Sequence, residues 1–292
     1  MKKYLNLLYL IFLELKRLIF KTRYFAEIDI TDNCNLRCKH CYHFKGKEEL
    51  NRQDLPLDVW RTRFEELHRA GVRIVLLVGG EPALRSDILM LADGIFPFIF
   101  IITNGTVKVP DEFKHLLFVS LDGNRERNDF VRGAGVFSKV LSNYSQDPRV
   151  VFNVTVTSDN YHEVETIVKL AKEKGLRGVV CNVYTPTVGK SSALFIKTEN
   201  RKTIMSELKR VKKLYPDYFL LTPPMITWYE FPDHTGFCHW GDEALHYDVA
   251  WKKRRCFTGL DCSNCGCFAG SLQNPLQLLM YPPVMKKLLV MS

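Results

Sequence analysis

The feature that most constrains the fold is a regular alternation of short apolar runs with longer amphipathic stretches. Each apolar run is rich in β-branched and aromatic residues and has the length of a strand. The strand candidates are residues 24–31, 73–79, 98–103, 116–122, 150–157 and 178–184. The helix candidates are residues 57–70, 86–95, 136–145, 161–174 and 199–214. Strands that are apolar almost throughout are typical of parallel sheets that helices cover on the outside.

Six strand–helix units are too few for a closed eight-stranded barrel, but they fit a partial barrel or a doubly wound sheet. We therefore expect an α/β fold, a partial (βα)6 TIM-like barrel over residues 23–215. An N-terminal helix over residues 1–22 precedes it. From residue 216 the alternation stops and proline, aromatic residues and cysteine become frequent. Residues 216–292 are expected to form a small irregular, cysteine-rich extension.

Polar residues recur where successive strand candidates end. Because the carboxyl ends of parallel strands meet at one edge of a sheet, these residues are expected to share a site. They are Gly79-Gly80-Glu81-Pro82, Thr103-Asn104-Gly105, Ser120 with Asp122 and Gly123, Asn153 with Thr155 and Thr157, and Asn182 with Tyr184. The alternative for any single position is an ordinary turn residue.

Three of the nine cysteines, Cys34, Cys38 and Cys41, follow the first strand candidate. Clustered cysteines in a chain of 292 residues indicate a metal or iron–sulfur site and not a disulfide framework, so a reducing cytoplasm is expected. Three thiolates can hold three irons of a cubane cluster and leave the fourth iron open. Zinc is the alternative, with His40 or His43 as a fourth ligand.

The Cys-x3-Cys-x2-Cys loop after the first strand, with Gly79-Gly80-Glu81-Pro82 after the second, resembles the radical SAM superfamily, whose members use S-adenosylmethionine (SAM). The resemblance covers about residues 24–190. It implies that His40 lies near the adenine, that Gly79, Gly80, Glu81 and Pro82 contact the SAM amino group, and that Ser120 and Asp122 contact its ribose or carboxylate. Asn104, after the third strand, is assigned to the same SAM site.

The resemblance also implies a reaction. The open iron of a [4Fe–4S] cluster would chelate SAM, and an electron from a donor such as flavodoxin or ferredoxin would cleave it. The resulting 5′-deoxyadenosyl radical would abstract a hydrogen atom from a substrate that the sequence does not identify, with peptides, proteins and lipids as the favoured classes. The competing class is a non-catalytic iron–sulfur or zinc protein that acts in electron transfer or sensing.

Five further cysteines lie in the C-terminal extension: Cys238, Cys256, Cys262, Cys265 and Cys267. Their first half resembles the SPASM or twitch extension, in which a hairpin carries ligands of an auxiliary iron–sulfur cluster. Trp251 stands where that pattern has glycine, and the second half is shorter than the full SPASM pattern. The resemblance implies one auxiliary cluster; a structural zinc site and unligated thiols are the alternatives. Cys181, inside an apolar strand, is expected in the core.

The first 22 residues predict an amphipathic helix. Its longest apolar run, Leu7–Leu13, is too short to span a bilayer. One side of the helical wheel carries the polar residues Lys2, Lys3, Asn6, Glu14, Arg17 and Lys21, among which Leu10 and Leu13 also fall. The helix either packs on the protein's own core or lies in an anionic membrane surface, on the inner face of the membrane.

The formal net charge of +9 favours anionic partners. Basic residues cluster in two further places, one within residues 199–214 and one at 252–255. Each is either a solvated face or a site for a phosphate-bearing substrate, RNA or a membrane surface. Nucleic acid is therefore not excluded as a partner.

Overall fold

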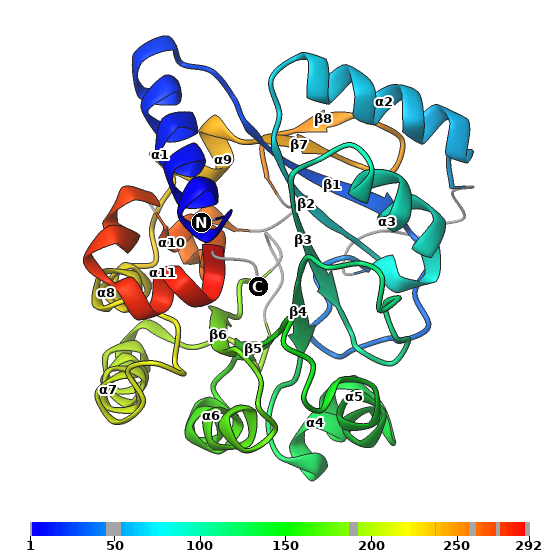
Figure 1. The fold of residues 1–292 in the computed structure, drawn as a ribbon. Coiled ribbons are helices and arrows are strands. Elements are labelled where there is room, and N and C mark those ends of the chain that lie inside the picture. Colours follow the sequence, from blue (N-terminus) through cyan, green and yellow to red (C-terminus); the bar gives the residue numbers. More distant parts are fainter. Residues whose placement is uncertain are drawn as a thin grey trace.

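The computed structural model describes residues 2–44, 54–186, 192–236, 238–256, 261–272 and 275–289. Its centre is one eight-stranded sheet in the order β6-β5-β4-β3-β2-β1-β7-β8 (Figure 1). The strands are β1 (Phe25–Thr31), β2 (Ile74–Gly79), β3 (Phe98–Thr103), β4 (Leu116–Ser120), β5 (Val150–Val156), β6 (Gly178–Val183), β7 (Leu245–Tyr247) and β8 (Lys253–Arg254). All neighbouring strands pair in parallel except β7 and β8.

The predicted α/β class with an open, partial barrel is confirmed. The six predicted strands are β1 to β6, in chain order along the sheet, and β6 and β8 form its two edges. All six residues of β2 are buried, as the continuous apolar run requires. Helices cover the outside of the sheet: α2 (Leu57–Arg69), α3 (Ser86–Asp93), α4 (Arg125–Arg132), α5 (Val136–Tyr144), α6 (Val164–Glu173) and α7 (Thr198–Leu214). Short 3₁₀ turns occur at η1 (Pro82–Arg85), η2 (Tyr161–Glu163) and η3 (Cys262–Asn264).

Helix α4 was not expected from the sequence. Its residues, RERNDFVR, show no apolar periodicity, because most of them are charged or polar. The helix begins where the side chain of Asn124 accepts a hydrogen bond from the Arg127 N–H. It ends at Arg132, which is buried beside the candidate site.

The C-terminal segment is not irregular throughout, and it continues the sheet of the barrel. It contains α8 (Pro223–Glu230), α9 (His239–Glu243), β7, β8, α10 (Phe268–Ser271), η4 (Pro275–Met280) and α11 (Pro282–Leu289). Strand β7 pairs in parallel with β1, and the Arg254 guanidinium of β8 bonds both carboxylate oxygens of Asp29 at 2.7 and 2.8 Å. The sequence pattern missed these elements because each is short.

The N-terminal helix, α1 (Lys2–Phe20), packs on the protein through part of the side that the helical wheel marks as polar. Glu14 is 2% exposed and accepts hydrogen bonds from Arg17 and from the Tyr24 hydroxyl at 2.7 Å. The opposite side is apolar and faces outward: Leu8, Phe12, Leu15, Leu18, Ile19 and Phe20 are exposed. The inward side also carries apolar residues, of which Leu13 is 5% exposed, so burial of apolar area alone does not explain why the apolar outer side stays exposed.

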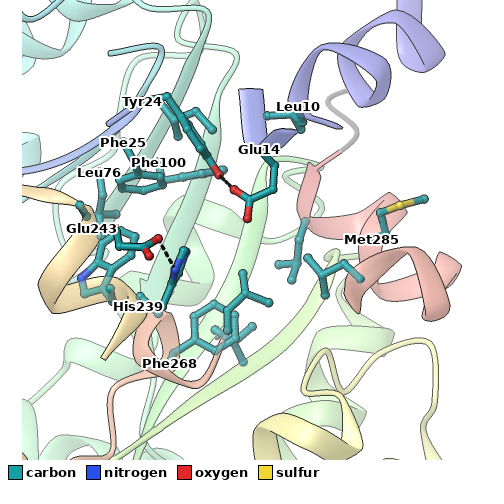
Figure 2. A pocket seen from close by; sticks show the side chains of 18 of the residues that line it. Leu10, Glu14, Tyr24, Phe25, Leu76, Phe100, His239, Glu243, Phe268 and Met285 are labelled. Carbon is teal, nitrogen blue, oxygen red and sulfur yellow. Dashed lines mark hydrogen bonds and ion pairs between the residues drawn. The ribbon is translucent and has the colours of Figure 1, made fainter. Parts of the chain in front are cut away.

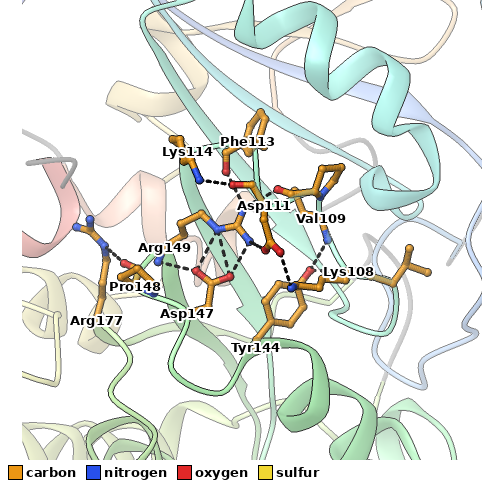
Figure 3. Close-up of polar contacts among 12 residues, drawn as sticks. Lys108, Val109, Asp111, Phe113, Lys114, Tyr144, Asp147, Pro148, Arg149 and Arg177 are labelled. Carbon is orange, nitrogen blue, oxygen red and sulfur yellow. Dashed lines mark hydrogen bonds and ion pairs between the residues drawn. The ribbon is translucent and has the colours of Figure 1, made fainter.

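Arg149 organises the loops at the amino end of β5 (Figure 3). The candidate site lies at the other end of the strands, where they reach their carboxyl ends. The Arg149 guanidinium donates to Asp147 and to the carbonyl oxygens of Pro110 and Phe113, both at 2.6 Å. Two loops, one between β3 and β4 and one between α5 and β5, thus share one buried cation.

Replacing Arg149 by Met should lower the free energy of unfolding by about 3 kcal/mol, because Asp147 and two carbonyl groups would lose their partner. Urea unfolding at neutral pH measures the change. The exposed Arg61, replaced in the same way, is the control and should change stability by less than about 0.5 kcal/mol. Equal losses in both variants would contradict the role given to Arg149.

Candidate active site

The three cysteines that follow β1 line one cavity. Cys34, Cys38 and Cys41 border a space of about 180 Å³ at the carboxyl ends of the strands. The loop is held by the Lys39 N–H, which donates to the Val131 carbonyl of α4 at 2.9 Å. The Asn104 side-chain amide lies 3.8 Å from the Cys34 Sγ. The topology therefore brings the cysteine loop, the end of β3 and the end of α4 together.

The Gly79–Gly80 turn is attached directly to the cysteine loop. The Gly80 N–H donates to the Thr31 carbonyl at 2.7 Å, and the Glu81 N–H donates to the Asn33 carbonyl at 2.8 Å. Gly79 has a φ of 122°, and a Cβ there would lie 2.4 Å from the Thr31 oxygen. A Cβ on Gly80 would lie 2.2 Å from the Asn33 oxygen. Only glycine permits this approach of two backbones.

Glu81 lies at the wall of the cavity and is fully buried. Its carboxylate accepts hydrogen bonds from the Thr103 hydroxyl and the Asn104 N–H, both at 2.6 Å, and from the Ala83 N–H at 2.9 Å. Burial raises the pKa of Glu81, although these three donors oppose the shift. A bound ammonium group would favour the ionised carboxylate, so the position suits a cationic ligand group.

Asp122 lies behind the cavity and not on its wall. It is fully buried, and its carboxylate lies 2.6 Å from the His40 Nε2 and 2.7 Å from the Arg132 Nε. The Thr155 N–H donates to its other oxygen at 2.8 Å. Burial alone would raise the pKa of Asp122, but Arg132 and His40 hold it well below its ordinary value. Asp122 thus positions His40 and Arg132, and the direct SAM contact that the resemblance implied stays a prediction.

Asp122→Asn should therefore weaken the protein most at neutral pH. A lowered folded-state pKa gives stability that is present above the ordinary pKa of about 4 and is lost as pH falls through the folded-state value. We expect a loss of about 3 kcal/mol at pH 7, because Arg132 would stay buried without its counter-charge. Urea unfolding between pH 7 and pH 3 should also show a shallower acid dependence in the variant than in wild type. Exposed Asp58→Asn is the control; a parallel pH profile for D122N would refute the assignment.

Six of the eight residues that the resemblance assigns to SAM line the cavity: His40, Gly79, Gly80, Glu81, Asn104 and Ser120. Pro82 begins η1 and is buried, outside the lining. Sequence reasoning missed Arg132, which lines the cavity from the end of α4. Asn124, a favoured N-cap residue, followed by Glu126 in the first turn, is a signal that could have revealed the helix. Asn153, Thr155, Asn182 and Tyr184, expected at a shared site from the strand ends, also line the cavity.

The three thiols suit an iron–sulfur cluster by number and chemistry. None of the nine cysteines, all of which lie in the described ranges, forms a disulfide. Burial raises the pKa of Cys34, and it raises the pKa of Cys38 to about 11; the Cys41 thiol adds to both shifts. Ligation would release their protons. Within the described ranges, no three His, Cys, Asp or Glu side chains already stand as a ready metal cage.

The five C-terminal cysteines gather in one region beside the barrel. Burial raises the pKa of Cys265 to about 11, and Cys238 and Cys262 add to the shift. Burial raises the pKa of Cys267 as well, and Cys265 and Cys256 add to the shift. Cys267 also lines the cavity that Cys34, Cys38 and Cys41 border. Cys181 is fully buried in β6, so its prediction as a core residue is confirmed.

Gly266 and Trp251 fix this region to the sheet. The Val183 N–H at the end of β6 donates to the Gly266 carbonyl at 2.8 Å, and a Cβ on Gly266 would lie 2.0 Å from the Val183 oxygen. Trp251, between β7 and β8, has a φ of 62°. It therefore adopts the left-handed conformation that favours glycine, the residue of the SPASM-like pattern at this position. Its ring stacks on the Tyr247 ring with 4.5 Å between the ring centroids. This stacking offsets part of the backbone strain.

Four residues of the two basic clusters form ion pairs within the protein. Lys209 bonds Glu230, and Arg210 bonds Glu207 and Glu165. Arg254 bonds Asp29 and Arg255 bonds Asp242. These contacts favour the structural alternative over a nucleic-acid surface.

Comparison with known proteins identifies the family. The model of the radical SAM superfamily matches residues 28–198, and the chain therefore belongs to this superfamily. Members of the superfamily are enzymes that bind a [4Fe–4S] cluster and SAM. Fe-coproporphyrin III synthase of Methanosarcina barkeri (strain Fusaro / DSM 804) is 28% identical over 212 residues, which cover 65% of this chain and 52% of that protein. The mycofactocin maturase MftC of Mycolicibacterium smegmatis is 32% identical over 165 residues, which cover 50% of this chain and 41% of that protein.

Among solved structures, Streptococcus suis SuiB bound to S-adenosylmethionine aligns with a TM-score of 0.64 at 16% identity. The alignment covers 91% of this chain and 67% of SuiB. At this identity the likeness establishes the fold alone. The chain spans about half the length, or less, of the curated relatives it matches.

Proposed function

We propose that this chain cleaves SAM reductively and uses the cleavage to remove a hydrogen atom from an organic substrate. The observation that carries the proposal is the joining of the cysteine loop to the Gly79–Gly80 turn by two backbone hydrogen bonds, with Glu81 buried at the wall of the same cavity. The alternative of a non-catalytic metal protein leaves the turn and the buried Glu81 unexplained.

Different residues around the cavity would bind the cluster and the different groups of SAM. A [4Fe–4S] cluster held by Cys34, Cys38 and Cys41 would supply the electron for cleavage. Glu81 would bind the ammonium group of SAM, and the Arg132 guanidinium, which lines the same cavity, would attract its carboxylate. His40, held by Asp122, and Ser120 and Asn104 complete the wall. Burial of these groups excludes water from the reacting atoms.

The five C-terminal thiols hold an auxiliary iron–sulfur cluster in this proposal. Their mutual pKa effects and the contact of Cys267 with the main cavity support the idea. A cluster there would lie beside the substrate space and could pass electrons to or from it. A small reduced protein such as flavodoxin or ferredoxin would be the electron donor, in the reducing cytoplasm.

Anaerobic reconstitution with iron and sulfide tests the proposal. With dithionite and SAM, the loaded protein should form 5′-deoxyadenosine. Iron and sulfide counts of about eight per chain would indicate two clusters, and about four would indicate one. If the protein carries its full iron and sulfide content and still leaves SAM intact under these conditions, the proposal is wrong.

We further propose that the outer face of α1 lies on an anionic membrane surface. Leu8, Phe12, Leu15 and Ile19 form an exposed apolar stripe, and the exposed Lys16, Lys21 and Arg23 stand near its C-terminal end. This combination suits acyl chains and anionic head groups together. Among the described residues, no helix is long and apolar enough to cross a bilayer.

Co-sedimentation with vesicles measures this association. The chain should bind vesicles that contain anionic phospholipid, and L8S/F12S/L15S/I19S should reduce binding at least about tenfold, since four apolar side chains leave the interface. A chain with Leu57, Leu84, Met90 and Leu214 replaced by Ser, all exposed elsewhere, is the control. Equal binding by both variants would exclude α1 as the contact.

A further inference from the structure

A second cavity lies inside the open barrel, beneath α1 (Figure 2). It has a volume of about 190 Å³, and each of the six parallel strands β1 to β6 contributes to its wall. The opposite wall comes from α1, α9, α10, η4 and α11. In Figure 2, Leu10 of α1 and Met285 of α11 lie on the helical side, with Phe25 and Phe100 on the sheet.

Most of the side chains that line the cavity are apolar. The charged side chains in the lining are paired with neighbouring residues of the lining. Tyr24 donates to Glu14 at 2.7 Å, Arg17 donates to Glu14 at 2.9 Å, and His239 lies 2.6 Å from Glu243. A peptide or sugar in this space would lose water from its polar groups and gain few partners. Apolar cavities of this size stay dry and accept hydrocarbon.

The apolar cavity adjoins the candidate SAM site. Ile102, Asn153, Asn182 and Cys267 line both spaces. The Asn182 amide donates to the Asn153 oxygen at 2.7 Å, and the Phe268 N–H donates to the Asn182 oxygen at 2.7 Å, so these side chains form the shared wall. A chain that fills the apolar cavity would therefore reach the wall that borders the candidate SAM site.

The cavity reaches the surface beside the outward apolar face of α1. Leu279 of η4 lines the cavity and is also 42% exposed, and η4 packs against α1. The next residue, Met280, is 75% exposed. Leu279 thus connects the lining of the cavity with the exposed apolar surface at Met280.

We propose that this cavity binds the hydrocarbon chain of an amphiphilic lipid and presents one end of that chain to the SAM site. The inference rests on the proposed function for the chemistry that follows, but binding is a property of the cavity itself. The substrate class is thereby a lipid and not a peptide.

Calorimetric titration of the reconstituted full chain with n-alcohols, without reductant, tests the binding. Affinity should rise about fourfold for each added methylene from butanol upward, and then level off when the cavity is full. Ala269→Phe, which adds a ring to the lining, should weaken octanol binding at least about tenfold. Leu10→Ala, which enlarges the cavity, should move the plateau to longer alcohols.

Ala70→Phe is the matched control, because Ala70 is exposed at the end of α2 and lies outside the cavity. It should bind octanol as wild type does. Circular dichroism checks that each variant folds. If Ala269→Phe does not fold, Leu10→Ala still tests the cavity.

Two outcomes would overturn the inference: affinity without dependence on chain length, or an octanol affinity that neither cavity variant changes. Displacement of octanol by a short leucine-rich peptide with higher affinity would favour a peptide substrate and also overturn it. 5′-Deoxyadenosine formation is measured separately. Alcohol binding without SAM cleavage would reject the proposed function and leave the cavity assignment standing, whereas the reverse result would reject the cavity assignment alone.

Discussion

Cys38→Ala should abolish SAM cleavage, with a fall in 5′-deoxyadenosine formation of at least about 10³-fold, because the three thiolates act as one unit. Cys38 lies in the middle of the loop and lines the cavity. Loss of its thiolate leaves two ligands, too few to hold a cubane cluster with one open iron. Iron content and 5′-deoxyadenosine, measured after identical anaerobic reconstitution, check the expectation.

Cys181→Ala is the matched control, since it also removes one buried thiol but lies within β6, in the core. It should keep its iron and its activity, with a stability loss of about 1 kcal/mol. Replacing Cys262, Cys265 and Cys267 together by Ala separates the two groups of thiols: only two C-terminal thiols would remain, so the iron content should fall by about half while the Cys34 group stays loaded. Full iron content and normal cleavage in the Cys38 variant would show that the loop is not the cluster site.

Gly80→Ala should lower the rate of SAM cleavage by about 10²-fold or more, although it removes no ligand and no charge. The new Cβ would lie 2.2 Å from the Asn33 oxygen, so the turn and the cysteine loop must separate. A displacement of about 1 Å at reacting groups costs about 10²-fold in rate. The two hydrogen bonds that join Gly80 and Glu81 to the loop would weaken as well.

Gly94→Ala is the control, because Gly94 follows α3 with a φ of −74° and the nearest atom to its added Cβ lies 3.6 Å away. Its cleavage rate and SAM affinity should match wild type. SAM affinity measured by equilibrium dialysis distinguishes a displaced site from a misfolded protein, provided that both variants melt near the wild-type temperature. Normal cleavage by Gly80→Ala would mean that the turn does not position the site.

Local pattern accounts for the parts of the fold that were predicted well. Strands β1 to β6 read as continuous apolar runs because both faces of each strand are buried, and helices such as α6 carry one clear apolar face. Helix α4 and strands β7 and β8 escaped prediction for the opposite reason. The first is nearly all polar, and the others are two or three residues long and exist through pairing with β1 and with each other.

The residues of the candidate site also fall into those that the sequence predicted and those that only the structure revealed. The spacing of Cys34, Cys38 and Cys41 and the Gly79–Pro82 sequence are local signals, and the cysteine loop and most of that sequence line one cavity. The role of Asp122 was not local. Only the approach of His40 and of Arg132, from two other segments, shows that its carboxylate is already occupied.

The sequence alone determined the α/β class, the positions of the six parallel strands along the chain and the residues that mark the radical SAM superfamily, since each depends on near neighbours in the chain. The tertiary structure decided which side of α1 faces outward. Burying Glu14 with Arg17 and Tyr24 satisfies three polar groups at once, and this holds the helix with Leu8, Phe12 and Ile19 exposed. It also decided that the space inside the barrel is apolar and adjoins the candidate SAM site, because its walls come from segments far apart in the sequence.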